Sequence, residues 1–342
     1  MVDTTLPNNR QAARAPAKWR VERLTDRETI RALLVPEETY AAYALAQLAP
    51  SLFPRSEWWS ASGPAGRALV LHSRGGLGPA LLAVGDAAAL DVLLGLHPGP
   101  RTCFASFRPE HLEVVQRHFL LARKELMVRM SVTRETFRRA EGEAVRLHGR
   151  DLGPINRLYS AEGGPAAYSS GHIEEGVYYG VMAEGRLVSI AGTHVDSPAE
   201  RVAVVGNVFT HPRYHGTGLA TIATSAVTQA LLERCDLVAL TVEVSNAPAL
   251  AVYAKLGYRQ QCTLYETPAV RKEPLGLASG LRRLAAAWRG SRERKEIVVR
   301  WDQRTKERAD DLLHRRPLPT NRDAGRGHVQ QGAGGRRCRA LR

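Results

Sequence analysis

The sequence has few of the residues that mark disulfide-stapled, metal-binding or membrane-spanning proteins. Its 342 residues include four cysteines, Cys103, Cys235, Cys262 and Cys338, which lie far apart and form no C-x-x-C pair. No histidines stand at metal-ligand spacing, so we expect neither a disulfide framework nor a bound metal. No apolar run approaches the roughly 20 residues that cross a bilayer, and residues 1–17 lack the apolar core of a signal peptide. We therefore expect a cytoplasmic protein without a membrane span.

Acidic residues are scarce at only one end of the chain. Residues 1–270 carry 28 Lys and Arg against 26 Asp and Glu, whereas residues 271–342 carry 20 against 8, so the second segment holds +12 of the net charge of +14. We expect this segment to be a basic tail, disordered or partly helical, with a possible amphipathic helix in LGLASGLRRLAAAWRG. Such a run can bind nucleic acid or anionic lipid, and nucleic acid is expected as a partner only through it. It lacks the interleaved aromatic residues of a stacking platform.

Hydrophobic periodicity predicts a mixed α/β (α+β) fold of two tandem units, each a central twisted sheet flanked by helices. A flexible lead-in over residues 1–17 precedes a unit over 18–142 and a second unit over 143–270. The first unit is predicted to contain strands at 19–24, near 58, 69–71, 81–84, 102–107 and 126–132, and helices starting at Thr25 and Pro36 and spanning 87–96 and 111–121. Both units show the same element order, although no repeat is visible residue by residue.

The second unit has clear start and turn signals. Asp151 is expected to cap a helix over 150–160, and Glu184-Gly185 is typical of a hairpin turn. The remaining elements are predicted as strands at 144–149, 177–183, 186–195, 201–210, 237–244 and 262–265, and helices at 219–234 and 248–256.

A glycine-spaced turn in VGNVFTHPRYHGTGLATIATSAV connects a predicted strand to a strongly amphipathic helix. Gly216 and Gly218 remove side chains where the helix begins, which leaves free backbone N–H groups and the positive end of the helix dipole facing one point. Such a place suits a phosphate or pyrophosphate, although glycines in a tight connection can serve the turn alone. No G-x-G-x-x-G fingerprint with its acidic partner and no G-K-[ST] are present, which excludes dinucleotide-dependent hydride transfer and Walker-type hydrolysis by motif.

This segment resembles the acetyl-CoA pyrophosphate loop of the GNAT superfamily of N-acetyltransferases, whose motif is [QR]-x-x-G-x-[GA] after a strand ending in V-x-x-P. The Gln or Arg of the family falls on His215, or on Arg213 in a shifted reading. A neutral imidazole is a weaker phosphate partner than a guanidinium. The resemblance implies acetyl-CoA binding, as acyl donor, by His215, Gly216, Thr217, Gly218, Leu219 and Ala220.

A second stretch, S-N-A-P-A-L-A-V-Y-A-K-L-G-Y, matches the N-x-x-A-x-x-x-Y-x-x-x-G-[FY] signature of the same family. The resemblance places Asn246 beside the pantetheine arm and the Tyr253 hydroxyl near the thioester sulfur, where it could protonate the departing thiolate. Taken alone, Tyr253 could equally be a half-buried helix tyrosine. The order of the two motifs along the chain supports the catalytic interpretation.

The strand before the loop has a further implied role. Members of the family pair the pantetheine amides with this strand, so the main-chain groups of Val208, Phe209 and Thr210 are expected to contact the donor. Gly206-Asn207 is predicted to form a bulge or break that separates this strand from the strand at 237–244.

The general base is less well marked. Acyl transfer needs an unprotonated amine, and residues 202–211 contain no Asp or Glu. The candidates are Glu243, His194, and Glu174 or Glu175. Each has an ordinary alternative, because glutamates near strand ends are usually solvated and strand histidines are usually half-buried structural residues. An amine that arrives neutral would need none of them.

Residues 19–140 follow the element order of the family without its loop. Only Gly85-Asp86 stands between the fourth strand and the next helix, and Asp86 at a helix start would repel a pyrophosphate. This unit resembles a degenerate GNAT domain in a tandem arrangement, expected to pack against the active unit and shape the acceptor cleft. Trp58 and Trp59 could line that cleft or belong to the core.

The sequence thus predicts an acetyl-CoA-dependent N-acyltransferase that moves an acetyl group to a primary amine by direct attack in a ternary complex. Two alternatives stay open: a non-catalytic acyl-CoA sensor that keeps the loop without the chemistry, and a nucleic-acid-associated protein acting through its basic tail. The acceptor, the acyl-chain preference and the oligomeric state are not specified by these motifs.

Overall fold

The computed structural model describes residues 17–74, 78–162, 168–273, 277–290 and 297–301. We call residues 17–142 the N-terminal half and residues 143–273 the C-terminal half. The N-terminal half contains β1 (Ala17–Leu24), α1 (Arg27–Leu34), α2 (Glu38–Ala46), β2 (Ser56–Gly63), β3 (Gly66–Ser73), β4 (Ala80–Gly85), α3 (Ala87–Leu96), β5 (Thr102–Phe107), α4 (Leu112–His118), β6 (Phe119–Leu121) and β7 (Leu126–Val132).

The C-terminal half repeats this order from a short first strand onward, except that β6 has no counterpart among its described elements. It contains β8 (Val145–Arg146), α5 (Leu152–Tyr159), α6 (Ser170–Glu175), β9 (Tyr179–Ala183), β10 (Arg186–Ser197), β11 (Val202–Thr210), α7 (Leu219–Leu232), β12 (Leu237–Glu243), α8 (Ala247–Lys255) and β13 (Arg259–Arg271). Two further elements follow it, α9 (Leu277–Gly290) and β14 (Ile297–Trp301). The predicted mixed α/β architecture is confirmed.

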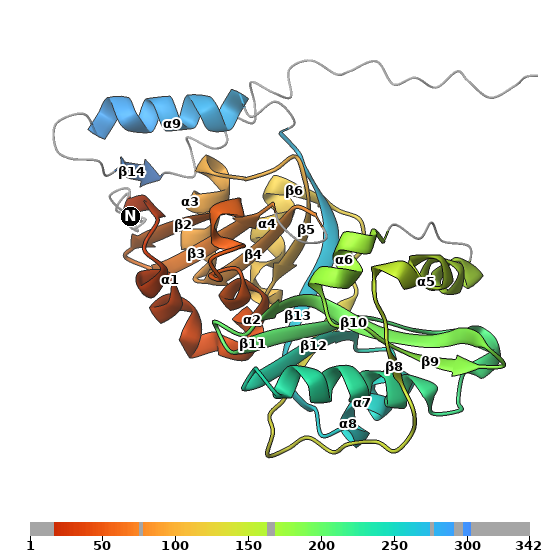
Figure 1. Ribbon diagram of the computed structural model, residues 1–342. Helices are drawn as coiled ribbons and strands as arrows, with labels where there is room; N and C mark the ends of the chain where they lie inside the picture. The colour runs from red at the N-terminus through yellow and green to blue at the C-terminus, as the bar shows by residue number, and fades with distance from the viewer. Residues whose placement is uncertain (1–16, 75–77, 163–167, 274–276, 291–296, 302–342) are drawn as a thin grey trace, which may run out of the picture. The chain divides into compact units, whose positions relative to one another are not determined.

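One mixed sheet runs through both halves (Figure 1). Its strand order is β14-β1-β2-β3-β4-β5-β13-β7-β12-β11-β10-β9-β8, with β6 paired to β13. β4 pairs with β5, and β11 with β12, in parallel, while the other printed pairs are antiparallel. Each half therefore has one parallel pair at the corresponding place in its element order.

The two halves exchange their last strands. β7, the last strand of the N-terminal half, pairs with β12 of the C-terminal half. β13, the last strand of the C-terminal half, pairs with β5 of the N-terminal half and also with β7. The units predicted over 18–142 and 143–270 thus share a continuous sheet, and the boundary between them remains a prediction.

Helices cover both faces of the sheet, which explains why many strands are apolar at successive positions. On β4, Leu81 and Ala83 belong to the core that contains α3 and α4, whereas Leu82 and Val84 belong to the core that contains α1 and α2. The core under α1 and α2 extends to Val204 of β11 in the C-terminal half. α7 and α8 cover the face opposite to α1 and α2 in the C-terminal half.

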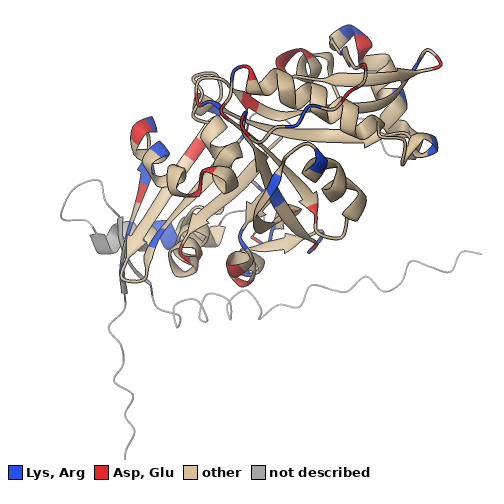
Figure 2. Ribbon diagram, turned by 90° about the horizontal axis from the view of Figure 1, so that it is seen from below, with Lys and Arg blue, Asp and Glu red and all other residues tan. Residues whose placement is uncertain are grey.

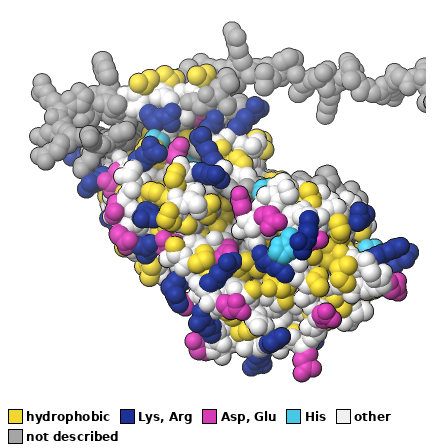
Figure 3. All heavy atoms as spheres, in the orientation of Figure 1, with side chains coloured by type: hydrophobic (Ala, Val, Ile, Leu, Met, Phe, Trp, Pro, Cys, Tyr) yellow, Lys and Arg dark blue, Asp and Glu magenta, His cyan; other side chains and the backbone are white. Residues whose placement is uncertain are grey.

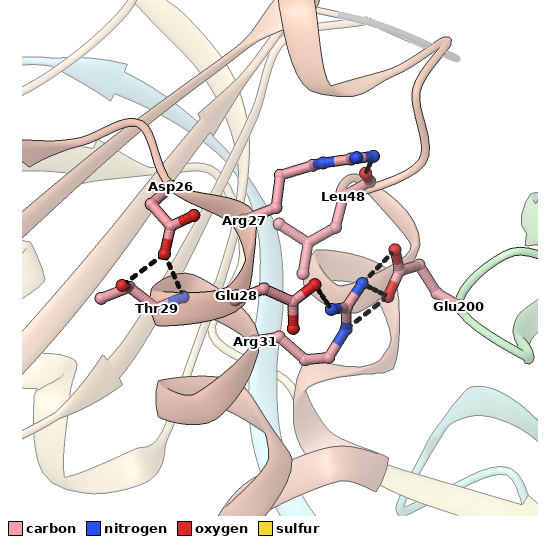
Figure 4. A network of polar contacts seen from close by, with 7 residues as sticks. All are labelled: Asp26, Arg27, Glu28, Thr29, Arg31, Leu48 and Glu200. Carbon is pink, nitrogen blue, oxygen red and sulfur yellow. Dashed lines mark hydrogen bonds and ion pairs between the residues drawn. The ribbon is translucent and has the colours of Figure 1, made fainter.

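An ion-pair network ties α1 to the C-terminal half (Figure 4). The α1 helix begins after Asp26, one residue beyond the predicted Thr25, because the Asp26 carboxylate accepts a hydrogen bond from the Thr29 N–H at 2.8 Å. Arg31 of the same helix donates to Glu200, with Nε–Oε2 at 2.9 Å and Nη2–Oε1 at 2.7 Å. Glu200 lies in the turn between β10 and β11, and its side chain is 5% exposed.

Some predicted boundaries are wrong in detail. The helix predicted over 111–121 ends at His118, because the apolar residues of β6 pair with the end of β13 instead of continuing the helix. Asp151 occupies the predicted N-cap position of α5, but its side chain makes no capping hydrogen bond there. Its carboxylate instead accepts a hydrogen bond from the His148 N–H at 2.9 Å. The hairpin is confirmed, since Glu184 and Gly185 have φ angles of 51° and 71° between β9 and β10.

The segment predicted as a basic tail includes described elements. The helix predicted in 275–290 is present as α9, and β14 pairs antiparallel with β1. Residues 302–342 lie outside the described residues. Among the described helices none is both long and apolar enough to span a bilayer. Figure 2 shows basic and acidic residues interspersed over the described elements, in keeping with the near balance of charge in residues 1–270.

Candidate functional site

The parallel strands β11 and β12 separate halfway along. Their pairing runs from Val202–Leu237 to Val205–Leu240 and no described pair continues it. Asn207, with φ of 55°, turns the strand at this point, as the Gly206-Asn207 dipeptide predicted. The main chain of Val208, Phe209 and Thr210 therefore has no partner strand on the side of β12, which leaves polar backbone groups open to a ligand.

Three tyrosines hold the bend of β11 in place. Tyr159 donates its hydroxyl to the carbonyl oxygen of Asn207 at 2.6 Å, and Tyr168 donates to Asn207 Oδ1 at 2.8 Å. Asn207 Nδ2 in turn donates to the Tyr178 hydroxyl at 3.0 Å. Sequence reasoning missed this cluster, because the tyrosines come from three separate segments and only the asparagine beside a glycine marked the bend.

The loop between β11 and α7 presents unpaired backbone donors. Gly216 and Gly218 have φ angles of 77° and 84°, a region that favours glycine, and Gly218 occupies the N-cap position of α7. A Cβ built on either glycine meets nothing within 4 Å, so the space in front of the helix is open. Within the described residues, the N–H groups of Gly216, Thr217 and Gly218 have no acceptor, and those of Leu219 and Ala220 lie in the first helical turn.

His215 has a structural task in this loop. Its Nε2 lies 2.8 Å from the carbonyl oxygen of Thr210, and because a carbonyl can only accept, Nε2 is the donor. In the neutral imidazole Nδ1 then carries no proton, so it cannot donate a hydrogen bond to a phosphate. Arg213, in contrast, is exposed and its guanidinium has no partner among the described residues, so the shifted reading of the motif places a cation at the loop.

The second motif positions Asn246 and Tyr253 on α8. Asn246 is the N-cap residue of this helix, and its Oδ1 accepts from the Ala249 N–H at 3.1 Å. Tyr253 is 7% exposed, packs edge-to-face against Tyr258, and has a hydroxyl that no described residue hydrogen-bonds. Burial raises the pKa of Tyr253 to about 12. The hydroxyl therefore stays protonated at neutral pH, as a proton donor must.

The four base candidates lie in different surroundings. Glu174 accepts from the Gly149 N–H at 2.8 Å, so its carboxylate joins α6 to the turn before α5. Glu175 is exposed at the end of α6. Glu243 is half-buried at the end of β12, and alternation along the strand places it on the face of Ala239, as expected.

His194 lies at the point where β11 and β12 separate. Its ring covers the backbone of Gly206 so closely that a Cβ added to this glycine would stand 2.2 Å from Nε2. The residue keeps solvent access, yet desolvation by the surrounding protein lowers the pKa of His194 below its usual value, against the opposing effect of Glu266. The imidazole is therefore neutral at physiological pH and able to accept a proton.

A buried ion pair beside His194 was not foreseen from the sequence. Arg129 of β7 donates through Nη2 to Glu266 Oε1 at 2.8 Å, and the Arg129 side chain is 1% exposed. Both charges act on the pKa of His194. They belong to the two exchanged strands, so only knowledge of the strand exchange could have placed them next to a residue of β10.

The corresponding place in the N-terminal half is filled by protein. β4 and β5 also pair only over their first residues, from Ala80–Phe104 to Leu82–Ser106. Beyond that point, the fully buried His111 contacts the carbonyl oxygen of Gly85 through Nε2 at 2.7 Å, and Tyr40 donates its hydroxyl to the carbonyl oxygen of Ala83 at 2.5 Å. Asp86 caps α3 with hydrogen bonds from the N–H groups of Ala88 and Ala89 at 2.8 and 3.0 Å.

The two tryptophans of β2 do not form a ligand-binding wall. Trp58 is 1% exposed in the core under α1 and α2. Trp59 stacks on His97, with ring centroids 3.4 Å apart. The core alternative considered for this pair is therefore correct for Trp58, and Trp59 packs against the opposite core.

The chain is similar to known proteins both in a segment of its sequence and in its fold. The model of the acetyltransferase (GNAT) family matches residues 151–258. A solved structure of a Drosophila protein is 12% identical, with a TM-score of 0.50 over 74% of this chain and 98% of its own. This likeness concerns the fold alone.

Two bacterial structures are also similar. A GCN5-related N-acetyltransferase from Kribbella flavida is 18% identical over 68% of this chain and 95% of its own, with a TM-score of 0.48. A putative acetyltransferase of the GNAT family from Novosphingobium aromaticivorans is 24% identical over 59% and 88%, with a TM-score of 0.46. No curated protein sequence matches the chain.

Proposed function

Because residues 151–258 form a domain of the acetyltransferase (GNAT) family, we propose that this protein moves an acetyl group from acetyl-CoA to a primary amine. The observation that carries the proposal is the coincidence of two openings in the C-terminal half. The strands β11 and β12 separate after Val205, and the unpaired N–H groups of Gly216 to Gly218 stand at the end of the separated strand. In the N-terminal half β4 and β5 also separate, but His111 and Tyr40 fill the separation and Asp86 takes the free N–H groups of the helix start.

The donor would be held mainly by main-chain groups. The N–H groups from Gly216 to Ala220 and the dipole of α7 suit the pyrophosphate, with Arg213 rather than His215 as the nearby cation. The main chain of Val208 and Phe209 would pair with the pantetheine amides, whereas the Thr210 carbonyl oxygen already accepts from His215. Asn246 keeps its side-chain NH₂ available for the same arm, because only its Oδ1 is used by the helix cap.

The transfer itself would need one proton acceptor and one proton donor. The amine nitrogen of the acceptor attacks the thioester carbonyl carbon in the ternary complex, and the carbon–sulfur bond breaks. The proton lost by the amine passes to the neutral imidazole of His194, and the departing thiolate takes its proton from the Tyr253 hydroxyl. Glu243, on the face of Ala239, remains the alternative acceptor of the first proton.

Binding of the donor tests the first part of the proposal. We expect Gly218→Glu to weaken acetyl-CoA binding by about a hundredfold or more in calorimetry, because it places a carboxylate where the pyrophosphate would lie. Gly185→Glu is the matched control: Gly185 also has a positive φ, and its Cβ position is also open, but it lies in the β9–β10 turn. Equal affinities of the two variants would overturn the pyrophosphate site.

Turnover tests the second part. A thiol-release assay with acetyl-CoA over a broad panel of primary amines is expected to show catalysis with at least one acceptor. If acetyl-CoA binds and Gly218→Glu abolishes binding, yet no amine releases thiol, the chain is an acyl-CoA sensor and the transferase proposal fails.

A further inference from the structure

The helix α9 packs on the N-terminal half with its apolar side exposed to solvent. Leu277, Leu281 and Leu284 follow the spacing i, i+4, i+7, which places them in one row along the helix. Their side chains are 66%, 66% and 68% exposed. Figure 3 shows hydrophobic side chains gathered at the top of the molecule, where Figure 1 places α9. We call these three leucines the leucine row.

The polar side of α9 is fixed to the N-terminal half. Arg282 Nε donates to the carbonyl oxygen of Gly95 at 2.9 Å, and Arg283 Nη1 donates to that of Leu96 at 2.6 Å. These carbonyls belong to the last turn of α3, where unpaired acceptors and the negative end of the dipole favour arginine. Glu273 also holds Arg282, at 3.0 Å. The orientation of α9 is therefore set by its arginines, and the leucine row faces solvent as a result.

The surroundings of the leucine row favour one class of partner. Residues 271–342, the segment that contains α9, carry 20 Lys and Arg against 8 Asp and Glu, so the segment as a whole attracts anions. A helix that has an apolar row and belongs to a basic segment of the sequence is typical of binding at the interface of an anionic bilayer. Aliphatic side chains give no stacking surface for nucleic-acid bases. One row of three leucines is also far smaller than the roughly 800 Å² per partner of a stable dimer.

We propose that α9 is a membrane-surface helix, which inserts its leucine row into the headgroup region of an anionic lipid bilayer and holds the N-terminal half against it. The interaction uses no residue of the donor site and is independent of acetyl transfer. Its affinity has two parts, apolar burial of the leucine row and attraction between the basic segment and anionic headgroups.

Flotation of the full chain with lipid vesicles tests this. We expect binding to mixed phosphatidylserine–phosphatidylcholine vesicles and much weaker binding to phosphatidylcholine alone. The double variant Leu281→Gln/Leu284→Gln should lower the partition coefficient by about tenfold or more, since each leucine loses its burial in lipid. Met182→Gln is the control, because Met182 is 46% exposed on β9, near the opposite end of the sheet from β14, and should leave binding unchanged.

Three results would overturn the proposal. Equal vesicle binding by the wild type and the double variant would assign the attraction to basic residues alone. A dimer in light scattering that the double variant dissolves would make the leucine row a contact between two copies. Absence of vesicle binding by a wild-type chain that still binds acetyl-CoA would exclude a membrane role for correctly folded protein.

Discussion

The helices α3 and α7 occupy corresponding places in the two halves, but their N-termini are capped in opposite ways. α3 begins with Asp86, whose carboxylate takes the free N–H groups of the first turn. α7 begins with Gly218, which has no side chain to do so. The space between the separated strands beside each helix also differs. In the N-terminal half His111 and Tyr40 fill this space, whereas in the C-terminal half it stays open. A shared topology thus provides the same place in both halves, and only a few side chains decide whether that place stays open to the proposed donor.

The largest effect is expected at Tyr253, which has no counterpart on α4, the equivalent helix of the N-terminal half. Tyr253→Phe should lower kcat by about a hundredfold, in the range usual for a lost acid catalyst, while acetyl-CoA affinity changes little. Tyr258→Phe is the control, since that hydroxyl contacts Thr228 at 2.8 Å and should affect stability alone. Equal kcat values for wild type and Tyr253→Phe would show that Tyr253 is not the proton donor, and that this difference between α8 and α4 has no catalytic role.

The pH dependence of turnover is the next test. The pKa of His194 is lowered, so the imidazole is neutral above that lowered value and becomes protonated below it. We expect kcat/KM to fall as the pH falls through a value under 6.5, the ordinary histidine pKa. His194→Gln should remove this acid limb and lower the plateau. An unchanged limb in the variant would transfer the role to Glu243.

Opening the filled cleft of the N-terminal half should cost stability. His111→Ala removes a fully buried ring and its hydrogen bond to the Gly85 carbonyl, so we expect a loss of about 2–4 kcal/mol in the free energy of unfolding by urea. His148→Ala is the control, since its side chain is 39% exposed. A loss under about 0.5 kcal/mol for His111→Ala would mean that this histidine does not stabilise the fold by filling the space between β4 and β5.

The smallest effect concerns the cap of α3. Asp86→Ala should lower the free energy of unfolding by about 1 kcal/mol, as loss of an N-cap does, and Asp86→Asn should restore most of it. The number of acetyl-CoA molecules bound per chain in calorimetry should not increase, because His111 and Tyr40 still fill the cleft. A second binding event in Asp86→Ala would show that the carboxylate alone keeps the two halves different.

Much of the fold was predictable because its signals are local. The helix α3 and the strands β5 and β7 have the predicted bounds, and both glycines of the α7 loop have the positive φ angles that their residue type permits. Wrong details arose where distant pairing overrode the local pattern, as in residues 119–121, which were predicted to be helical and form β6 against β13.

Only the part of the candidate site that we assign to the donor has a signal that is continuous in the sequence. Main-chain donors and a loop motif are continuous in sequence, whereas the surroundings of His194 combine Gly206 of β11, Arg129 of β7 and Glu266 of β13. Side-chain roles also depended on partners that the pattern cannot show: His215 and Glu174 are already engaged by a carbonyl and by a backbone N–H. Motif spacing therefore located the glycine loop before α7, which we propose holds the pyrophosphate, and left the acceptor side undetermined.

The strand exchange also has a consequence for biosynthesis. During translation the N-terminal half emerges with the edge of β5 unpaired, because its partner β13, in register from Tyr265–Phe107 to Val270–Thr102, is synthesised some 160 residues later. The edge of β7 likewise stays unpaired until β12, its partner in the Val132–Val238 pair, has been synthesised. Contacts this far apart in the chain slow folding. Neither half can complete its sheet before the other exists, so the nascent chain completes its sheet only after β13 has been synthesised.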